Sequence, residues 1–235
     1  MHFLIAAALF FAAAPSFAAD ATLAKILGPV FYRAAGTDRF APARGGEELL
    51  YGDAVKTGSG AIAHVLIGER GAVLVRENSE FVLQGNPQNT TLRFSFGEFL
   101  VGLRRKLERG ESFRVRTPSA VAAVRGTLFW GKTDAKKTTT YAGFGHAISV
   151  TAKGKTVLVQ AGETTTIPFG APPAEVKPSL IPVSYTDNFR IGDSLQDLES
   201  LVDLPQAAAP AAVPAPTPAA NAPDAPDEPS VPVKK

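Results

Sequence analysis

The feature that most constrains the fold is a strict alternation of apolar and polar residues in two short segments. Over residues 92–97, Leu and Phe alternate with Arg, Ser and Gly, and over residues 113–117 Phe, Val and Thr alternate with two arginines. Side chains of a strand point alternately to opposite faces, so a period of two indicates a strand with one buried and one wet face. The pattern predicts two strands with their phenylalanines in a core and their arginines in solvent.

Glycine-rich turns separate further short segments of strand-like composition. Other apolar segments that favour strands lie at 61–67, 72–75, 81–83, 147–150 and 156–159. Turn signals lie between them at 52–53, 58–60, 68–71, 85–87 and 153–155. Many short strands at this spacing, without helical segments between them, predict an all-β domain over residues 22–168, built as a sandwich, a barrel or a β-solenoid.

The amino-terminal residues 1–18 have the pattern of a signal peptide. Residues 3–14 form an unbroken apolar run, Pro15 ends it, and Ser16 and Ala18 are the small residues that signal peptidase reads. The run is shorter than the roughly 20 apolar residues that span a bilayer. We expect export with cleavage after Ala18, and an uncleaved membrane anchor is the alternative. Because the sequence has no cysteine, a core rather than disulfides must hold the exported domain together.

The region after the predicted domain divides into two parts. Residues 169–205 form an extension in which apolar residues at helical spacing, with Asp193 and Gln196 as a capping box, predict a short amphipathic helix over 193–204. Residues 206–235 consist mostly of Ala and Pro, which offers nothing to bury and predicts a disordered tail. No segment after the signal peptide is long and apolar enough to predict a transmembrane helix.

The sequence offers little that could serve catalysis, a metal or a cofactor. Residues 192–195 read Gly-Asp-Ser-Leu, as in the nucleophile motif of one esterase class, but no histidine follows Ser194 to activate it. The histidines beyond the signal peptide, His64 and His146, are isolated and no cysteine accompanies them, so no metal-ligand cluster is recognisable. We therefore expect neither catalytic, cofactor-binding nor metal-binding residues.

The distribution of charge points to a binding surface. The formal net charge is only +2, but basic residues are concentrated between 104 and 137 and acidic residues between 175 and 203. Loops on a rigid β scaffold commonly carry binding residues, and a basic loop attracts an acidic protein face or an anionic polymer. The predicted interaction surface consists of Arg104, Arg105, Lys106 and Arg109. The alternative is that these residues pair with the acidic extension; nucleic acid is not expected outside the cytoplasm.

Several motifs together resemble the FecR-type periplasmic domain family. The motifs are Leu-x-x-Gly-Asp-x-Val-x-Thr-Gly at 49–58, Phe-Arg-Val-Arg-Thr-Pro-Ser-Ala at 113–120, Arg-Gly-Thr-x-Phe at 125–129 and Val-x-Ala-Gly-Glu at 159–163. The resemblance covers residues 22–168 and implies a β-strand domain that binds proteins or wall components and has no catalytic centre. In iron-uptake members, this domain follows a cytoplasmic sigma-factor-binding helix bundle and one transmembrane span. Neither is recognisable here, which favours a stand-alone exported sensing domain.

The motif residues also have a local physical interpretation. Glycine permits positive φ angles, and Asp or Thr side chains bond nearby backbone amides, so both motif pairs are expected to shape tight turns. The residues expected to have this structural role are Gly52, Asp53, Thr57, Gly58, Thr117, Pro118, Gly126 and Thr127.

These observations predict a non-catalytic periplasmic module for binding or regulation, which recognises a periplasmic or outer-membrane protein or an anionic envelope polymer. The alternative is a structural protein of the cell envelope that associates with the wall through its β domain and its tail.

Overall fold

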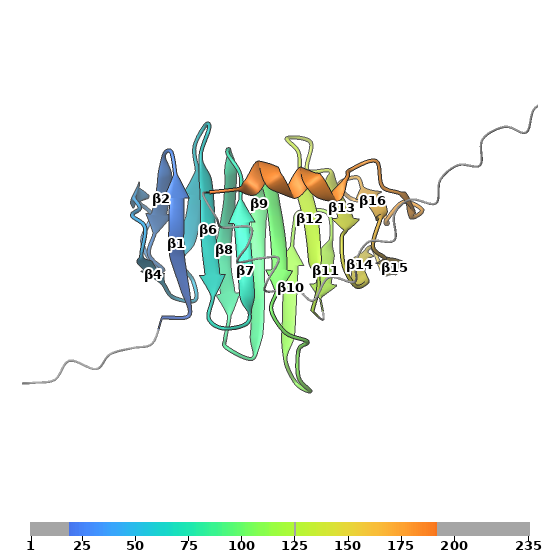
Figure 1. Ribbon diagram of the computed structural model, residues 1–235, viewed down its shortest axis with the longest axis horizontal. Coiled ribbons are helices and arrows are strands. Elements are labelled where there is room, and N and C mark those ends of the chain that lie inside the picture. Colours follow the sequence, from blue (N-terminus) through green and yellow to red (C-terminus); the bar gives the residue numbers. More distant parts are fainter. Residues whose placement is uncertain (1–18, 125, 192–235) are drawn as a thin grey trace, which may run out of the picture. The chain divides into compact units, whose positions relative to one another are not determined.

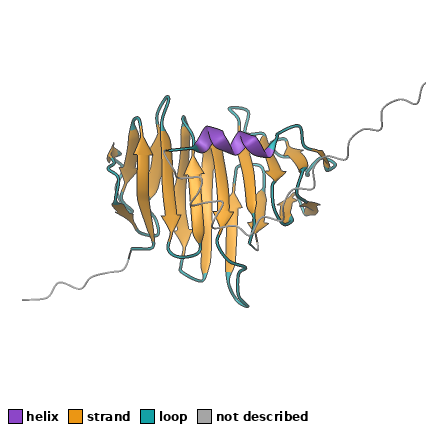
Figure 2. Ribbon diagram, in the orientation of Figure 1, coloured by secondary structure: helices purple, strands orange, loops and turns teal. Residues whose placement is uncertain are grey.

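The computed structural model describes residues 19–124 and 126–191. These residues form an all-β fold, which confirms the fold class predicted from the alternation and the turns. The strands form two layers, which we call sheet A and sheet B (Figures 1 and 2). The predicted signal peptide, the predicted helix at 193–204 and the predicted disordered tail lie outside the described residues.

Each sheet is a long row of strands that share hydrogen bonds with their neighbours. Sheet A has the order β4 (Glu47–Leu49), β1 (Ala21–Leu27), β6 (Ile62–Ile67), β7 (Gly71–Val75), the second half of β9 (Asn89–Leu103), β12 (Leu128–Thr133), β13 (Thr139–Gly143), β16 (Glu163–Ile167) and β17 (Lys177–Pro178). Sheet B has the order β3 (Ala41–Pro42), β2 (Val30–Arg33), β5 (Ala54–Thr57), β8 (Ser79–Gly85), the first half of β9, β10 (Ser112–Arg116), β11 (Val121–Val124), β14 (Ile148–Ala152) and β15 (Lys155–Val159). These pairs are antiparallel, except that β9 and β10 run parallel.

Strand β9 joins the two sheets because it turns a corner in its middle. Residues 90–96 pair with β8 in sheet B, whereas residues 97–102 pair with β12 in sheet A. Gly97 stands at the corner with a φ of 110°, and a side chain there would collide with Ser79. Glycine is the residue that accepts this φ without strain, so it lets one strand serve both layers.

An apolar core fills the space between the sheets. Phe94 of sheet B and Phe99 of sheet A stack across the corner of β9, with ring centroids 4.1 Å apart. Phe81 lies 5.2 Å from Phe94, and Phe129 and Tyr141 continue the aromatic cluster on sheet A. These rings are fully buried, so they contribute much of the apolar area that stabilises the fold.

The alternation predicted the facing of most residues in two strands correctly. On β9 and β10, Leu92, Phe94, Phe113 and Val115 are buried, while the arginines between them are exposed. The prediction was wrong for Phe96, which is 37% exposed. A β-bulge between β8 and β9 places Ser95 as an extra residue, which turns Phe96 to the outside of sheet B.

The outer face of sheet A carries a second apolar cluster, under a short helix. The 3₁₀ helix η1 (Val183–Phe189) runs across β7, β9 and β12, as the orange helix in Figure 1 shows. Phe189 is fully buried there, with Ile181 and Tyr185 beside it. The residues of the cluster beneath are Leu66, Ala72, Leu74, Leu100, Leu128, Trp130 and Ala142 of sheet A, and Phe144 directly after β13. The sequence did not predict η1, because its residues show no helical period.

No helix within the described part of the chain is long and apolar enough to cross a membrane.

Candidate interaction surfaces

The predicted interaction surface lies in the loop between β9 and β10. Arg104, Arg105, Lys106 and Arg109 are all exposed there. Arg105 is held inside the loop by a bidentate pair with Glu111, both N–O distances being 2.7 Å, and its Nη1 lies 3.7 Å from Glu108. The hydrogen bond from Arg105, followed by the backbone N–H of Glu108, lowers the pKa of Glu111 to about 2.

The four basic residues of this loop are therefore not equivalent. The side chains of Arg104, Lys106 and Arg109 form no ion pair within residues 19–124 and 126–191, so their charges remain available to a partner. The charge of Arg105 is compensated locally. The predicted alternative, pairing with the acidic extension, involves Glu175 and residues 187–203, of which 192–203 lie outside the described residues.

The first family motif surrounds a tight turn before β5. Gly52 has a φ of 106°. The buried carboxylate of Asp53 accepts the backbone N–H groups of Ala35 and Leu50, at 2.8 and 2.9 Å. Thr57 accepts the N–H of Ser79 at 3.0 Å, and the N–H of Gly58 donates to the carbonyl of Pro29 at 2.8 Å. These bonds satisfy backbone donors where strands of sheet B begin and end.

The second motif supports the loop that carries the predicted surface. Gly126 has a φ of 114°, and a Cβ there would lie 3.0 Å from the Cα of Lys106, so the loop packs directly on this glycine. Thr127 donates to the carbonyl of His146 at 2.8 Å. Thr117 is buried and bonds the backbone of Ala120, and Pro118 follows it. The contacts of these motif residues are structural ones.

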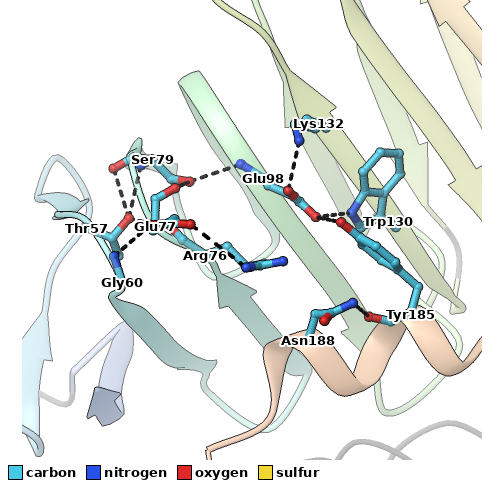
Figure 3. Close-up of polar contacts among 10 residues, drawn as sticks. All are labelled: Thr57, Gly60, Arg76, Glu77, Ser79, Glu98, Trp130, Lys132, Tyr185 and Asn188. Atoms are coloured by element: carbon cyan, nitrogen blue, oxygen red, sulfur yellow. Dashed lines mark hydrogen bonds and ion pairs between the residues drawn. The ribbon is translucent and has the colours of Figure 1, made fainter. Parts of the chain in front are cut away.

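A buried carboxylate ties η1 to sheet A, as Figure 3 shows. Glu98 of β9 is 8% exposed, and its Oε1 accepts the indole N–H of Trp130 at 3.0 Å and the hydroxyl of Tyr185 at 2.9 Å. Its Oε2 lies 3.3 Å from the Nζ of Lys132. Burial and the bond to Glu98 raise the pKa of the Tyr185 hydroxyl. Because both carboxylate oxygens of Glu98 have partners, the arrangement favours a structural role over acid–base chemistry. We call the contacts of Glu98 with Trp130, Lys132 and Tyr185 the latch.

A hollow of about 660 Å³ opens beside this latch. Arg76, Glu98 and Lys132 line it together with the rings of Phe96 and Tyr185. Charges of both signs are present, and Lys132 is already paired with Glu98. Within the described residues, no group of three or more His, Asp or Glu side chains could hold a metal ion.

The outer face of sheet B carries exposed arginines that have no partner among the residues that the structure describes. Because β9 and β10 run parallel in register, Arg93 lies directly opposite Arg116. Arg114 lies two residues before Arg116 on the same face, opposite Thr91. None of these three guanidinium groups forms a hydrogen bond or an ion pair with the described part of the chain. Lys137 stands near this group, with its Nζ 5.1 Å from the centroid of the Phe169 ring.

We call the outer face around Arg93, Arg114 and Arg116, together with Lys137 of the neighbouring loop between β12 and β13, the β10 surface. It is hollowed in two places. One hollow, of about 400 Å³, is lined by Arg93, Arg116 and Lys137, and another, of about 360 Å³, is lined by Arg114 and Leu158. The alternation predicted that these arginines point outward, but the nearly consecutive basic residues at 104–109 favoured the loop as the interaction surface. The parallel pairing that brings Arg93 to Arg116 leaves no local sequence signal.

Comparison with known proteins shows that part of this chain is similar to a family. The profile of the family described as FecR protein matches residues 53–164. Two crystal structures of a candidate anti-sigma factor from Parabacteroides distasonis ATCC 8503 are similar at 15% identity and a TM-score of 0.48. The similarity covers 54% of this chain and 59% of that chain. No curated protein sequence is significantly similar. The match to the FecR protein family at residues 53–164 agrees with the resemblance that the sequence motifs indicated.

Proposed function

We propose that this chain is a non-catalytic regulatory module of the periplasm that binds a protein or a component of the cell envelope. The match to the FecR protein family supports a regulatory or sensing role. The observation that carries the binding proposal is the contrast in charge compensation across the surface. Glu98, Lys132, Arg105 and Glu111 are paired within the protein, whereas the arginines of the β10 surface are exposed and unpaired within the described residues.

The proposed location rests on the amino-terminal sequence. The apolar run at 3–14 and the small residues at 16 and 18 support export and cleavage after Ala18. Mass spectrometry of the native protein would then find an amino terminus at Ala19 or a few residues away, and an intact Met1 in envelope fractions would argue against export.

The test of the binding proposal is cross-linking in the envelope of the native host. A tagged full-length chain is cross-linked in intact cells, and the captured species are quantified by mass spectrometry. A single protein recovered in fixed stoichiometry supports a sensing module. Sedimentation of most of the protein with wall material, without such a partner, would instead favour a structural protein of the envelope.

Variants of the loop at 104–109 make this test sharper. Arg104→Glu reverses a charge without breaking a described ion pair, whereas Arg105→Glu also breaks the pair with Glu111. If the loop contacts the partner, Arg104→Glu reduces capture and leaves the melting temperature nearly unchanged, since exposed substitutions usually change stability by less than about 0.5 kcal/mol. If only Arg105→Glu reduces capture, and the protein is destabilised, the loop acts through folding rather than contact.

A further inference from the structure

Within the described residues, the outer face of sheet B carries an unfavourable arrangement of charge. Arg93 and Arg116 are directly opposite each other on neighbouring strands, and like charges in such a pair destabilise a sheet. On the same face, Lys56 lies opposite Glu80, so the charges of that pair are opposite rather than alike. No carboxylate of the described residues pairs with Arg93, Arg114 or Arg116. An anionic partner would remove this repulsion.

The spacing of the arginines suggests the shape of that partner. Arg114 and Arg116 are alternate residues of one strand and face the same way, so their Cα atoms are about 6.7 Å apart. Carboxylates at alternate positions of an extended peptide have the same spacing. An Arg guanidinium binds a carboxylate through two parallel hydrogen bonds, which gives each position directional recognition.

The surface has room for such a peptide because the neighbouring residues are small. Ala123 of β11 lies opposite Arg114, and Ser149 of β14 lies opposite Ala123. Ala123 and Ser149 line the hollow of about 360 Å³ next to Arg114. The second hollow lies at Arg93 and Arg116, so β10 has a depression beside each of its arginines.

Apolar side chains on the same face favour a peptide over a free inorganic anion. Leu158 lines the hollow at Arg114 and is 62% exposed. Phe96, which the bulge turns outward, is 37% exposed and lies on the same outer face. Because β10 is paired on both sides, its backbone cannot accept an added strand, and recognition must come from side chains.

We propose that the β10 surface binds an extended acidic segment of a partner protein, with carboxylates at alternate positions and apolar residues between or beside them. Arg114 and Arg116 bind successive carboxylates, Arg93 and Lys137 add charge at the hollow of Arg116, and Leu158 contacts an apolar side chain. This inference rests on the proposed function, because it names the partner's chemistry.

The test uses the full chain and two labelled synthetic peptides of identical composition. In one peptide glutamates alternate with leucine and threonine, and in the other the glutamates are consecutive. Fluorescence anisotropy should show that the alternating peptide binds more tightly and that added salt weakens binding. Arg116→Ala and Arg114→Ala should each weaken binding at least about tenfold. Lys56→Ala, a loss of the same charge from the same sheet, should have little effect. Melting temperatures verify that all variants fold.

Other outcomes overturn the inference. Equal affinity for both peptides would indicate unspecific attraction of charge. Loss of binding only in Arg104→Ala would move the site to the loop. Vesicles containing anionic lipid that retain the chain through Arg114 and Arg116, without preference for the alternating peptide, would replace the peptide by a membrane surface. A cross-linked protein partner that ignores the Arg114 and Arg116 variants would refute this inference and leave the proposed function standing, whereas the absence of any partner would refute both.

Discussion

The outer faces of the two sheets differ in almost every respect, although both belong to one sandwich. In sheet A, a row formed by Leu74, Leu100 and Trp130 is apolar and lies under η1. In sheet B, a row in which Arg93 faces Arg116 is basic and exposed. The centre of sheet A is therefore buried on both faces, whereas sheet B keeps the half-wet character of an antiparallel sheet.

Strand β9 shows this difference within a single strand, because its two halves belong to the two sheets. In its first half the outward side chains of Arg93 and Phe96 are exposed, and in its second half the outward residue Leu100 is buried. The change occurs at Gly97, where the strand passes from one sheet to the other. One sheet is thus specialised for internal packing, and the other presents its outside to the surroundings.

The largest loss of stability should follow from a substitution on the outer face of sheet A, which η1 covers. Trp130→Ala removes a buried ring and a donor to Glu98, and a loss of about 3–5 kcal/mol in the free energy of unfolding is expected. Chemical denaturation measures this loss. Arg114→Ala, on the bare face, is the matched control and should change stability by less than about 0.5 kcal/mol. Equal effects of the two substitutions would remove the distinction between the faces.

Most of the strand pattern could be predicted from the sequence because alternation and glycine turns are local signals. The strands at β6, β7, β8, β14 and β15 lie where apolar segments between turns predicted them. The covering of sheet A could not be predicted in this way. The outward residues of sheet A are apolar, so the sequence suggests only that they are buried. No local pattern indicates that η1 covers them, because the contact between Tyr185 and Glu98 joins distant parts of the chain.

A smaller loss of stability is expected when the hydrogen bond between Tyr185 and Glu98 is removed. Tyr185→Phe keeps the ring against Trp130, with centroids 6.0 Å apart, but loses the hydroxyl that donates to Glu98. A loss of about 1 kcal/mol is expected for one such hydrogen bond. Tyr32→Phe is the control, because the Tyr32 hydroxyl makes no hydrogen bond with the described residues. Hydrogen exchange at residues 183–189 should become faster only in Tyr185→Phe; if both variants behave alike, the latch does not hold η1.

The stability of the loop between β9 and β10 should depend on pH rather than on the removal of apolar side chains. The pKa of Glu111 is lowered from its ordinary 4.5 to about 2, so its contribution to stability is complete above about pH 4.5 and is lost as the pH falls towards 2. An NMR titration of the carboxyl group should have its midpoint near 2. In Arg105→Gln the midpoint should rise towards 4.5, because the largest cause of the shift is removed. A midpoint near 4.5 in the unmodified protein would show that the pair does not form in solution.

The candidate site illustrates the limit of sequence reasoning. The basic residues at 104–109 are consecutive or nearly so, and therefore visible in a sequence, yet the most central of them, Arg105, is paired with Glu111. Arg93 and Arg116 are far apart in the sequence and become neighbours through the parallel register of β9 and β10. That register depends on how the whole chain winds between the sheets, which no local pattern reports.

The smallest change in the free energy of unfolding is expected for substitutions on the exposed outer face of sheet B, and the sign of this change is informative. Arg93→Ala and Arg116→Ala each remove one of two opposed like charges, so each should leave the free energy of unfolding within about 0.5 kcal/mol or raise it slightly. Their effects should not add, since the second substitution finds no repulsion left to relieve, and a double-mutant cycle measures this coupling. The coupling should decrease in high salt, which screens exposed charges. Clear destabilisation by both single substitutions would mean that the arginines support the fold, and the contrast between a packed and a bare face would lose its basis.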